Sequence, residues 1–346
     1  MKLLVRGTNW IGDSVMTIPA LRALRSAFPD AEIVLMTRAV NEGLFQDADF
    51  IDRVLPVETP NSGIAQTVRL ARRLRNERFD VGVVLPNSFA SALPLRLAGI
   101  PRRFGYATDR RKLLLTDSFP VPDWKATRHE VFYYHCLAGA IEERLLGKGP
   151  SEQVDLYPRI DISPERREAA RAFLIQHGLD LTRSIVAVGA GSTNSNAKRW
   201  PAERFVQTCE RLQKTLGAKI VLLGSEGDRA VSEQIMSGLG EKPLDLTGRT
   251  SIAEVSAILS VVDLLIANDM GLAHVAPAVG TRSLVIFGPT DPATTRPLSQ
   301  LADVIRHEVE CSPCMLRECP IDHRCMTRIG VDYVCDVATQ MLKLND

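Results

Sequence analysis

The fold of this chain is decided by the stretch VVDLLIANDMGLAHVAPAVGTRSLVIFGP, which spans Val261–Pro289. The apolar run Val261–Ala267 predicts a buried strand, Asn268–Gly271 a loop at its carboxyl end, and Gly271–Val279 a short helix before a second apolar run. Ligands of open α/β sheets bind beyond the carboxyl ends of the strands, and a helix N-terminus offers unpaired N–H groups to a phosphate. The stretch therefore predicts a phosphate or sugar site at this loop.

The residues of the loop fit such a site. Gly271 lets the backbone approach a ligand closely. Asp269, before Leu272, and His274, after it, add a carboxylate and an imidazole near the start of the helix. Each residue alone has a structural alternative, because an Asp before a helix is often its N-cap and a single His often packs in a core. Taken together they favour the ligand site.

The alternation of strands and helices continues in both directions along the 346 residues, which is typical of parallel sheets. A segment rich in Gly, Pro and charge at 147–164 indicates a domain boundary, since the chain exceeds the usual size of one domain. We predict an α/β fold of two doubly wound Rossmann-like domains, residues 1–160 and 161–346, facing a central cleft. A last helical pattern at 327–346 could pack on either domain.

The expected elements are defined by apolar periodicity and by turn residues. Strands are predicted at 2–6, 32–36, 53–57, 81–86, 184–189, 219–224, 263–268 and 283–288, and helices at 14–28, 63–76, 88–97, 164–177, 202–216, 228–239, 251–262 and 271–279.

Composition excludes several classes of function. Lys and Arg total 42 against 41 Asp and Glu, so no global field favours nucleic acid. The N-terminus lacks the pattern of a signal peptide, and no apolar run approaches the length of a membrane span. We therefore expect a cytoplasmic protein, which could still bind peripherally to the inner face of a membrane.

Three further groups of residues could carry chemistry. Asp13 follows the first strand, where its carboxylate could act as a general base or simply cap a helix. After the strand at 184–189, Ser192, Thr193 and Lys198 offer donors and a positive charge to a diphosphate, although a solvated loop is the plain alternative. After the next strand, Glu226 or Asp228 could bind the hydroxyls of a ribose, or form a turn capped by Asp228.

Other motifs narrow the choice. G-x-G-x-x-G, P-loop, HExxH and GxSxG patterns are all absent, and the D-x-D at Asp47–Asp49 lies in a connection between strands, so we interpret it as a loop. Cys311, Cys314, Cys319 and Cys325 have spacings compatible with a structural zinc, but the second pair lacks a tight C-x2-C. We predict no metal requirement.

Several motifs in order along nearly the whole chain resemble the lipopolysaccharide heptosyltransferases. They are Gly12-Asp13 with IPALRAL, LPNSFASAL at 85–93, AKRWP at 197–201, NDMGLAHVAPAVG at 268–280 and CSPCMLRECPIDHRCM at 311–326. The family has the GT-B fold, with the donor nucleotide in its C-terminal domain. Ala190 and residues 194–196 differ from what is usual there, which affects the details of phosphate binding.

The resemblance implies transfer of L-glycero-D-manno-heptose from ADP-heptose to the first heptose of a Kdo–lipid A acceptor, with inversion. Asp13 would be the general base. Ser192, Thr193, Lys198, Asp269, Gly271, Leu272 and His274 would bind the diphosphate and sugar, and Glu226 or Asp228 the ribose. Arginines 102, 103, 110 and 111 with Lys112 would form a basic patch for the acceptor, near Asn87 and Ser88; a solvated charged face is the alternative.

Other hypotheses of function remain open from the sequence alone. The chain could add a first or third heptose or another sugar, act as an epimerase on a nucleotide sugar, or bind a nucleotide sugar without catalysis. The effect of changing Asp13 discriminates between catalysis and binding, because a cap residue affects stability rather than turnover.

Overall fold

The structure, a computed structural model, describes residues 1–57, 63–147, 149, 155–193 and 195–344. The chain forms two compact units, Met1–Pro158 and Arg159–Asp346, a division two residues before the expected one. Each unit is built on its own six-stranded sheet, and every strand pairing is parallel. The prediction of two Rossmann-like α/β domains is confirmed.

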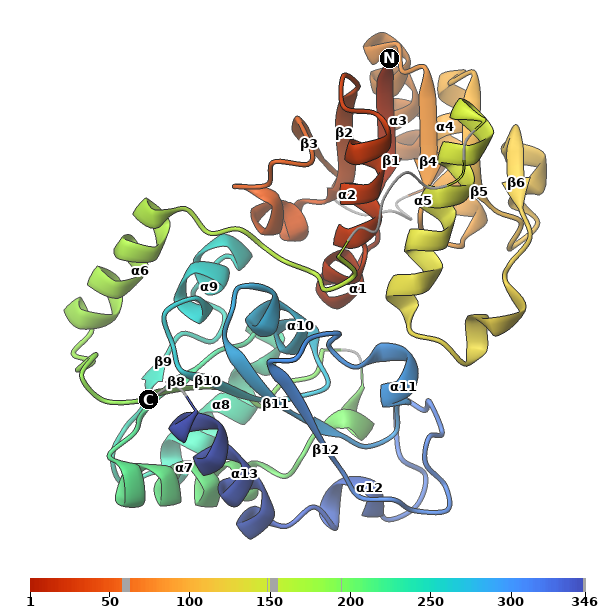
Figure 1. Ribbon diagram of the computed structural model, residues 1–346. Coiled ribbons are helices and arrows are strands. Elements are labelled where there is room, and N and C mark those ends of the chain that lie inside the picture. The colour runs from red at the N-terminus through yellow and green to blue at the C-terminus, as the bar shows by residue number, and fades with distance from the viewer. Residues whose placement is uncertain (58–62, 148, 150–154, 194, 345–346) are drawn as a thin grey trace. The chain divides into compact units, whose positions relative to one another are not determined.

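The first unit alternates strands and helices from its first residues onward (Figure 1). Its elements are β1 (Lys2–Arg6), α1 (Ile11–Met16), α2 (Ile18–Ala27), β2 (Glu32–Arg38), the 3-10 helix η1 (Ala39–Phe45), β3 (Arg53–Val57), α3 (Ile64–Glu77), β4 (Val81–Val84), α4 (Phe89–Ala98), β5 (Arg102–Tyr106), η2 (Arg111–Leu114), β6 (Asp117–Phe119), η3 (Asp123–Ala126) and α5 (Glu130–Leu146).

The strand order of this sheet is β3-β2-β1-β4-β5-β6, the order of a dinucleotide-binding domain. In Figure 1, α2 and α5 lie together on one face of the sheet, and α3 and α4 lie together on the other. Buried side chains between the sheet and α3 and α4, among them Leu4, Leu74 and Leu95, form a core. The predicted first helix is broken at Thr17, because Pro19 takes a position in the first turn of a new helix, α2, where its missing N–H costs nothing.

The second unit repeats the plan. Its elements are α6 (Pro164–Gln176), β7 (Ile185–Gly189), η4 (Asn196–Lys198), α7 (Ala202–Leu216), β8 (Lys219–Leu222), η5 (Glu226–Asp228), α8 (Arg229–Gly238), β9 (Leu244–Asp245), α9 (Ile252–Leu259), β10 (Leu264–Asn268), α10 (Gly271–Ala278), β11 (Arg282–Phe287), α11 (Pro292–Thr295), β12 (Ala302–Arg306), α12 (Arg324–Thr327) and α13 (Val331–Lys343).

The sheet of this unit has the order β12-β11-β10-β7-β8-β9, which is the same order as in the first sheet. The C-terminal helix α13 packs against α7, β10 and β11, and its Val334, Ala338 and Met341 belong to the core of the second unit. The question left open by the sequence is thereby answered in favour of the second unit.

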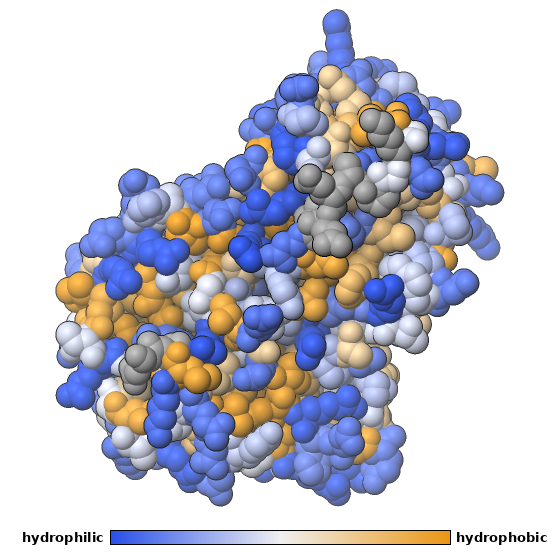
Figure 2. Space-filling model, in the orientation of Figure 1, coloured by the Kyte–Doolittle hydropathy of each residue, from blue (hydrophilic) through white to orange (hydrophobic). Residues whose placement is uncertain are grey.

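The surface of each unit is mixed in character. Figure 2 shows hydrophilic and hydrophobic residues side by side on the visible face, which is normal because apolar atoms supply more than half of the surface of folded proteins. None of the described helices has both the length and the apolar composition that crossing a bilayer requires. The doubly wound order matters more for function, because it places a switch point between β1 and β4 and another between β7 and β10.

Candidate active site

The switch point of the second unit is held together by Asn268, the last residue of β10. This side chain is fully buried. Its Nδ2 donates to the carbonyl oxygen of Ala190 (2.6 Å), and its Oδ1 accepts from the backbone N–H of Trp200 (3.0 Å). Trp200 is itself buried and donates from its indole to the carbonyl of Ile329 (3.2 Å). One amide therefore fixes the loops after β7 and β10 against each other.

Next to Asn268, Asp269 forms an ion pair with Lys198. Oδ2 of Asp269 lies 2.7 Å from Nζ of Lys198 and accepts a second hydrogen bond from the hydroxyl of Thr290 (2.6 Å). The carboxylate is almost buried, whereas 26% of the lysine side chain is exposed. The pair thus presents a partly exposed positive charge at the carboxyl edge of the sheet, as a diphosphate site needs.

The helix α10 begins directly after this pair. Its N-cap residue Met270 has extended backbone and gives no side-chain cap, so the first N–H groups of the helix receive no hydrogen bond from a capping side chain. Gly271 opens the helix, and Leu272 and His274 have buried side chains within its first turn. Leu272 can therefore meet a ligand only through its backbone. The start of α10 has the features of an anion site, and binding of an anion there stays a prediction.

The loop after β7 supplies the other wall. Ser192 is buried, and its carbonyl accepts from a guanidinium N–H of Arg199 (3.1 Å). The hydroxyl of Thr193, which is exposed, lies 3.4 Å from that of Ser225. Asn194, one of the residues that differ from the family pattern, lies outside the described residues. The hydrogen bond from Arg199 therefore holds the loop after β7 in place. The sequence did not predict this role, because Arg199 lies next to Lys198 in a charged segment.

The ribose candidates Glu226 and Asp228 have different environments. Asp228 is buried, and its Oδ2 accepts from the backbone N–H of Ser225 (2.9 Å) and from its hydroxyl (2.7 Å), which completes a capping box. The carboxylate also sits against Gly191, where a Cβ would lie 2.1 Å from it. The Glu226 side chain is 71% exposed and pairs with Arg229 at 2.9 Å. The capping box gives Asp228 a structural role, but its Oδ1 is buried without a hydrogen-bond partner among the described residues, so both carboxylates remain candidates for the ribose.

In the first unit, Asp13 lies at the switch point between β1 and β4. It is the third residue of α1, and the N-cap of that helix is Trp10. The alternative role of Asp13 as the N-cap residue is therefore wrong. Asp13 is half-buried. Burial and then the charge of Asp13 raise the pKa of the buried Tyr134 well above its usual range.

Asn87 and Ser88 follow β4, at the same switch point as Asp13. Both are exposed, and Oδ1 of Asn87 accepts from the hydroxyl of Tyr133 (2.8 Å), whose ring stacks on Tyr106 with centroids 4.1 Å apart. This hydrogen bond fixes the orientation of the Asn87 amide. Its N–H groups then point away from Tyr133 and can donate to a ligand. The two residues remain candidates for acceptor binding.

The predicted basic patch needs correction. Arg111 is fully buried and donates to the carbonyls of Tyr106 (2.8 Å) and Pro86, and burial lowers its pKa to about 10. Arg103 is buried too and donates to the carbonyl of Leu114 (2.7 Å). Both guanidiniums hold the fold together rather than face a ligand, because a charge run in sequence does not reveal which members turn inward. Arg110 is exposed, as is Lys112.

The cysteine-rich segment keeps its thiols free. Cys311 and Cys314 are exposed, Cys319 is half-buried, and Cys325 is buried. Burial raises the pKa of Cys325, and the other three thiols raise it further by smaller amounts. Among the described residues, no group of three or more His, Cys, Asp or Glu side chains is arranged to hold a metal ion.

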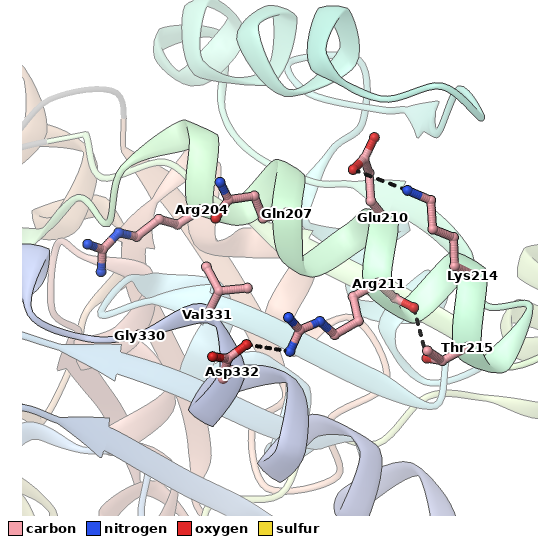
Figure 3. Close-up of a pocket in the computed structure, with 9 residues that line it drawn as sticks. All are labelled: Arg204, Gln207, Glu210, Arg211, Lys214, Thr215, Gly330, Val331 and Asp332. Carbon is pink, nitrogen blue, oxygen red and sulfur yellow. Dashed lines mark hydrogen bonds and ion pairs between the residues drawn. The ribbon is translucent and has the colours of Figure 1, made fainter.

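A separate pocket lies on the second unit, along α7 and the start of α13 (Figure 3). Its volume is about 560 Å³. Its charged side chains largely neutralise one another, since Arg211 pairs with Asp332 (2.6 Å) and Lys214 with Glu210 (3.6 Å). None of the predicted site residues lines it. We therefore place the chemistry at the switch points rather than in this pocket.

Two Rossmann-like units with polar groups at their switch points define a protein of the GT-B class of glycosyltransferases. The chain belongs to glycosyltransferase family 9 (heptosyltransferase), whose model matches residues 67–324. It is 30% identical over 314 residues to lipopolysaccharide heptosyltransferase 2 of Escherichia coli K12, covering 88% of each chain, and 30% identical to the enzyme of the same name from Salmonella typhimurium over 88% of each chain.

Solved structures agree with this assignment. The structure of Escherichia coli ADP-heptose lipopolysaccharide heptosyltransferase II matches with a TM-score of 0.84 at 28% identity, covering 100% of this chain and 99% of the other. A glycosyltransferase family 9 structure from Veillonella parvula has a TM-score of 0.85 at 23% identity, over 100% and 98% of the two chains, and supports the fold. The chain is thus a glycosyltransferase, and the predicted family and class of enzyme are confirmed.

Proposed function

We propose that the chain transfers L-glycero-D-manno-heptose from ADP-heptose to the first heptose of the lipopolysaccharide inner core, with inversion at the anomeric carbon. The similarity to heptosyltransferases named for the second transfer supports the choice of acceptor. The observation that carries the proposal is the Lys198–Asp269 pair beside the start of α10, because a positive charge and a helix N-terminus without a side-chain cap lie at one switch point.

The diphosphate of ADP-heptose is assigned to this switch point. Lys198 and the first N–H groups of α10 would stabilise the charge that develops on ADP as it leaves. Thr193, with its exposed hydroxyl, would donate to a phosphate oxygen, and Glu226 or Asp228 would accept from the ribose hydroxyls. This arrangement supplies the positive charge without a metal ion, so we propose that the reaction requires none.

Asp13 is assigned the role of general base. The oxygen of the acceptor hydroxyl attacks the anomeric carbon, its proton passes to the carboxylate of Asp13, and the bond from that carbon to the phosphate oxygen breaks to release ADP. Asn87, Ser88 and Arg110 would bind the acceptor, with Arg110 placed to pair with its anionic groups. Because that acceptor is anchored by lipid A, the protein would work in the cytoplasm at the inner face of the inner membrane.

The experiment that tests this proposal compares three acceptors. Purified protein is incubated with ADP-heptose and Kdo–lipid A carrying no heptose, one heptose or two, while acceptor mass and released ADP are followed together. A gain of one heptose with equimolar ADP on the mono-heptosylated acceptor alone is the expected result. A gain on either of the others would reassign the chain to the first or third transfer. ADP binding with no transfer to any acceptor would favour a binding protein.

A further inference from the structure

The first unit carries a concentration of arginine on one pair of helices. Residues 64–102 contain seven arginines and no lysine against two carboxylates. Six of these arginines are exposed and belong to α3, to its C-cap or to α4; we call them the α3–α4 surface: Arg69, Arg72, Arg73, Arg75, Arg78 and Arg96. This is a strong local charge on a chain whose net charge is only +1.

Helix geometry places three of these side chains on one face of α3. Arg69, Arg72 and Arg73 are spaced i, i+3 and i+4 and share a face of α3, while Ala71 and Leu74 on the other side are buried against the sheet. Arg75 donates to the carbonyl of Leu97 (2.7 Å). Since Leu97 follows Arg96 at the C-terminal end of α4, this bond places Arg75 beside the end of α4 that carries Arg96.

The two nearby carboxylates do not neutralise this surface. Glu77 accepts from Nζ of Lys2 (2.8 Å) and from a guanidinium N–H of Arg53 (2.8 Å), and Asp80 accepts from the backbone N–H of Lys2 (2.7 Å). Within the part of the chain that the structure describes, none of the six arginines has an ion-pair partner. The charge of the surface is therefore available to a partner that is itself negative.

We propose that the α3–α4 surface binds the anionic phospholipid headgroups of a membrane. Guanidinium groups match phosphate in charge and in geometry. Apolar side chains stand among the arginines, with Ile64 86% and Leu97 40% exposed, as a surface that enters the headgroup layer requires. Helix α3, which carries four of the six arginines, has no aromatic side chain on which a nucleic-acid base could stack, and the one aromatic residue of α4, Phe89, lies at the opposite end of that helix from Arg96, which favours lipid over nucleic acid.

This inference rests on the proposed function, since a lipid-anchored acceptor must be reached at a bilayer. Each basic residue near an anionic leaflet strengthens binding by about fivefold, and the attraction is screened over about 8 Å at physiological salt. Loss of three arginines from the surface should therefore weaken membrane binding by about a hundredfold.

The test measures vesicle binding of the full chain by co-sedimentation. Vesicles contain phosphatidylcholine alone or phosphatidylcholine and phosphatidylglycerol in equal amounts. The triple variant Arg69→Gln, Arg72→Gln, Arg73→Gln keeps good helix formers. Its matched control, Arg167→Gln, Arg171→Gln, Arg183→Gln, removes the same charge from exposed positions of the second unit. Circular dichroism verifies that both variants are folded.

The expected result is binding of the native chain to the anionic vesicles only, reduced by added salt, lost in the α3 variant and kept in the control. Equal binding by the two variants, or no binding of the native chain, would overturn the inference. Tighter binding to a single-stranded oligonucleotide than to the vesicles would overturn it in favour of nucleic acid. The proposed function is assayed separately on a deacylated, water-soluble acceptor, where the α3 variant should keep its rate.

Discussion

Nζ of Lys198 lies 2.7 Å from Oδ2 of Asp269, which joins the 3-10 helix after β7 to the carboxyl end of β10 across the switch point of the second sheet. The lysine side chain is held in place by a carboxylate that is nearly buried and that also accepts from Thr290. A cation fixed in this way loses little freedom when a phosphate binds, which is the physical advantage of a preorganised site.

Lys198→Ala should therefore weaken ADP binding by about tenfold to a hundredfold, because a hydrogen bond to a charged group contributes about 1.5–3 kcal/mol. Isothermal titration calorimetry with ADP measures the change. Lys214→Ala, which removes a lysine whose side chain is 75% exposed on α7, serves as the control and should leave ADP affinity unchanged. Unchanged affinity in Lys198→Ala would remove this lysine from the donor site.

Asp13→Asn tests the general base. The amide keeps the size of the side chain but cannot take a proton, so turnover should fall by about a hundredfold to ten-thousandfold. ADP affinity should stay close to that of the native chain, and the melting temperature should fall only slightly, because a carboxylate in the first turn of a helix contributes about 0.3–1 kcal/mol to stability.

The matched control for this prediction is Asp30→Asn, at an exposed position outside the helices. Both variants are compared by initial rates of ADP release with acceptor present. Native-like turnover of Asp13→Asn would assign the proton transfer to another group. A large loss of stability with proportionate loss of activity would return Asp13 to a structural role.

Glu226 and Asp228 stand two residues apart, and the structure predicts opposite effects for their variants. Asp228→Asn removes the charge of a buried carboxylate that accepts two hydrogen bonds from Ser225, so unfolding free energy should fall by about 1–3 kcal/mol. Glu226→Gln should leave stability intact, because its side chain is largely exposed, and should weaken ADP binding.

Urea unfolding and ADP titration of both variants measure these two quantities. The deoxyribose form of ADP adds a control, since a variant that has lost a contact to the ribose hydroxyls should bind both nucleotides alike. If Glu226→Gln still distinguishes them as the native chain does, the ribose is bound elsewhere.

Sequence reasoning found those parts of the molecule whose signal is local. The strand and helix of the 261–289 stretch were predicted to within three residues, because an apolar run followed by Gly271 leaves few alternatives. Strands β5, β6, β9 and β12 were missed. β6 and β9 have only three and two residues, and β6, β9 and β12 are mostly half-buried, so their apolar pattern is weak. β5 is mostly buried but begins with Arg102 and Arg103, which were interpreted as part of a charged patch. Helix α5 was missed as well, although His129 caps it through its side chain.

The site shows the same limit. Lys198 and Asp269 were both selected from their positions after strands, but their direct contact follows from strand order, which places β7 beside β10. Arg111 was assigned to the acceptor because it belongs to a run of charges, and its burial depends on how η2 folds against α4. Burial of single side chains in loops is set by tertiary packing, which one sequence does not display.

Glu77 provides a prediction on pH. Hydrogen bonding from Lys2, and then from Arg53, holds the pKa of its carboxyl below the usual range. A carboxyl with a lowered pKa in the folded state stabilises the fold above its unfolded pKa of about 4.3, and this contribution is lost as the pH falls through the folded pKa. Glu77→Gln should therefore lower the free energy of unfolding of the first unit at pH 7 more than at pH 3.

Urea unfolding at both pH values measures this difference. Glu143→Gln, at an exposed position on α5, is the control. An equal loss at both pH values would mean that Glu77 acts through packing rather than through its charge.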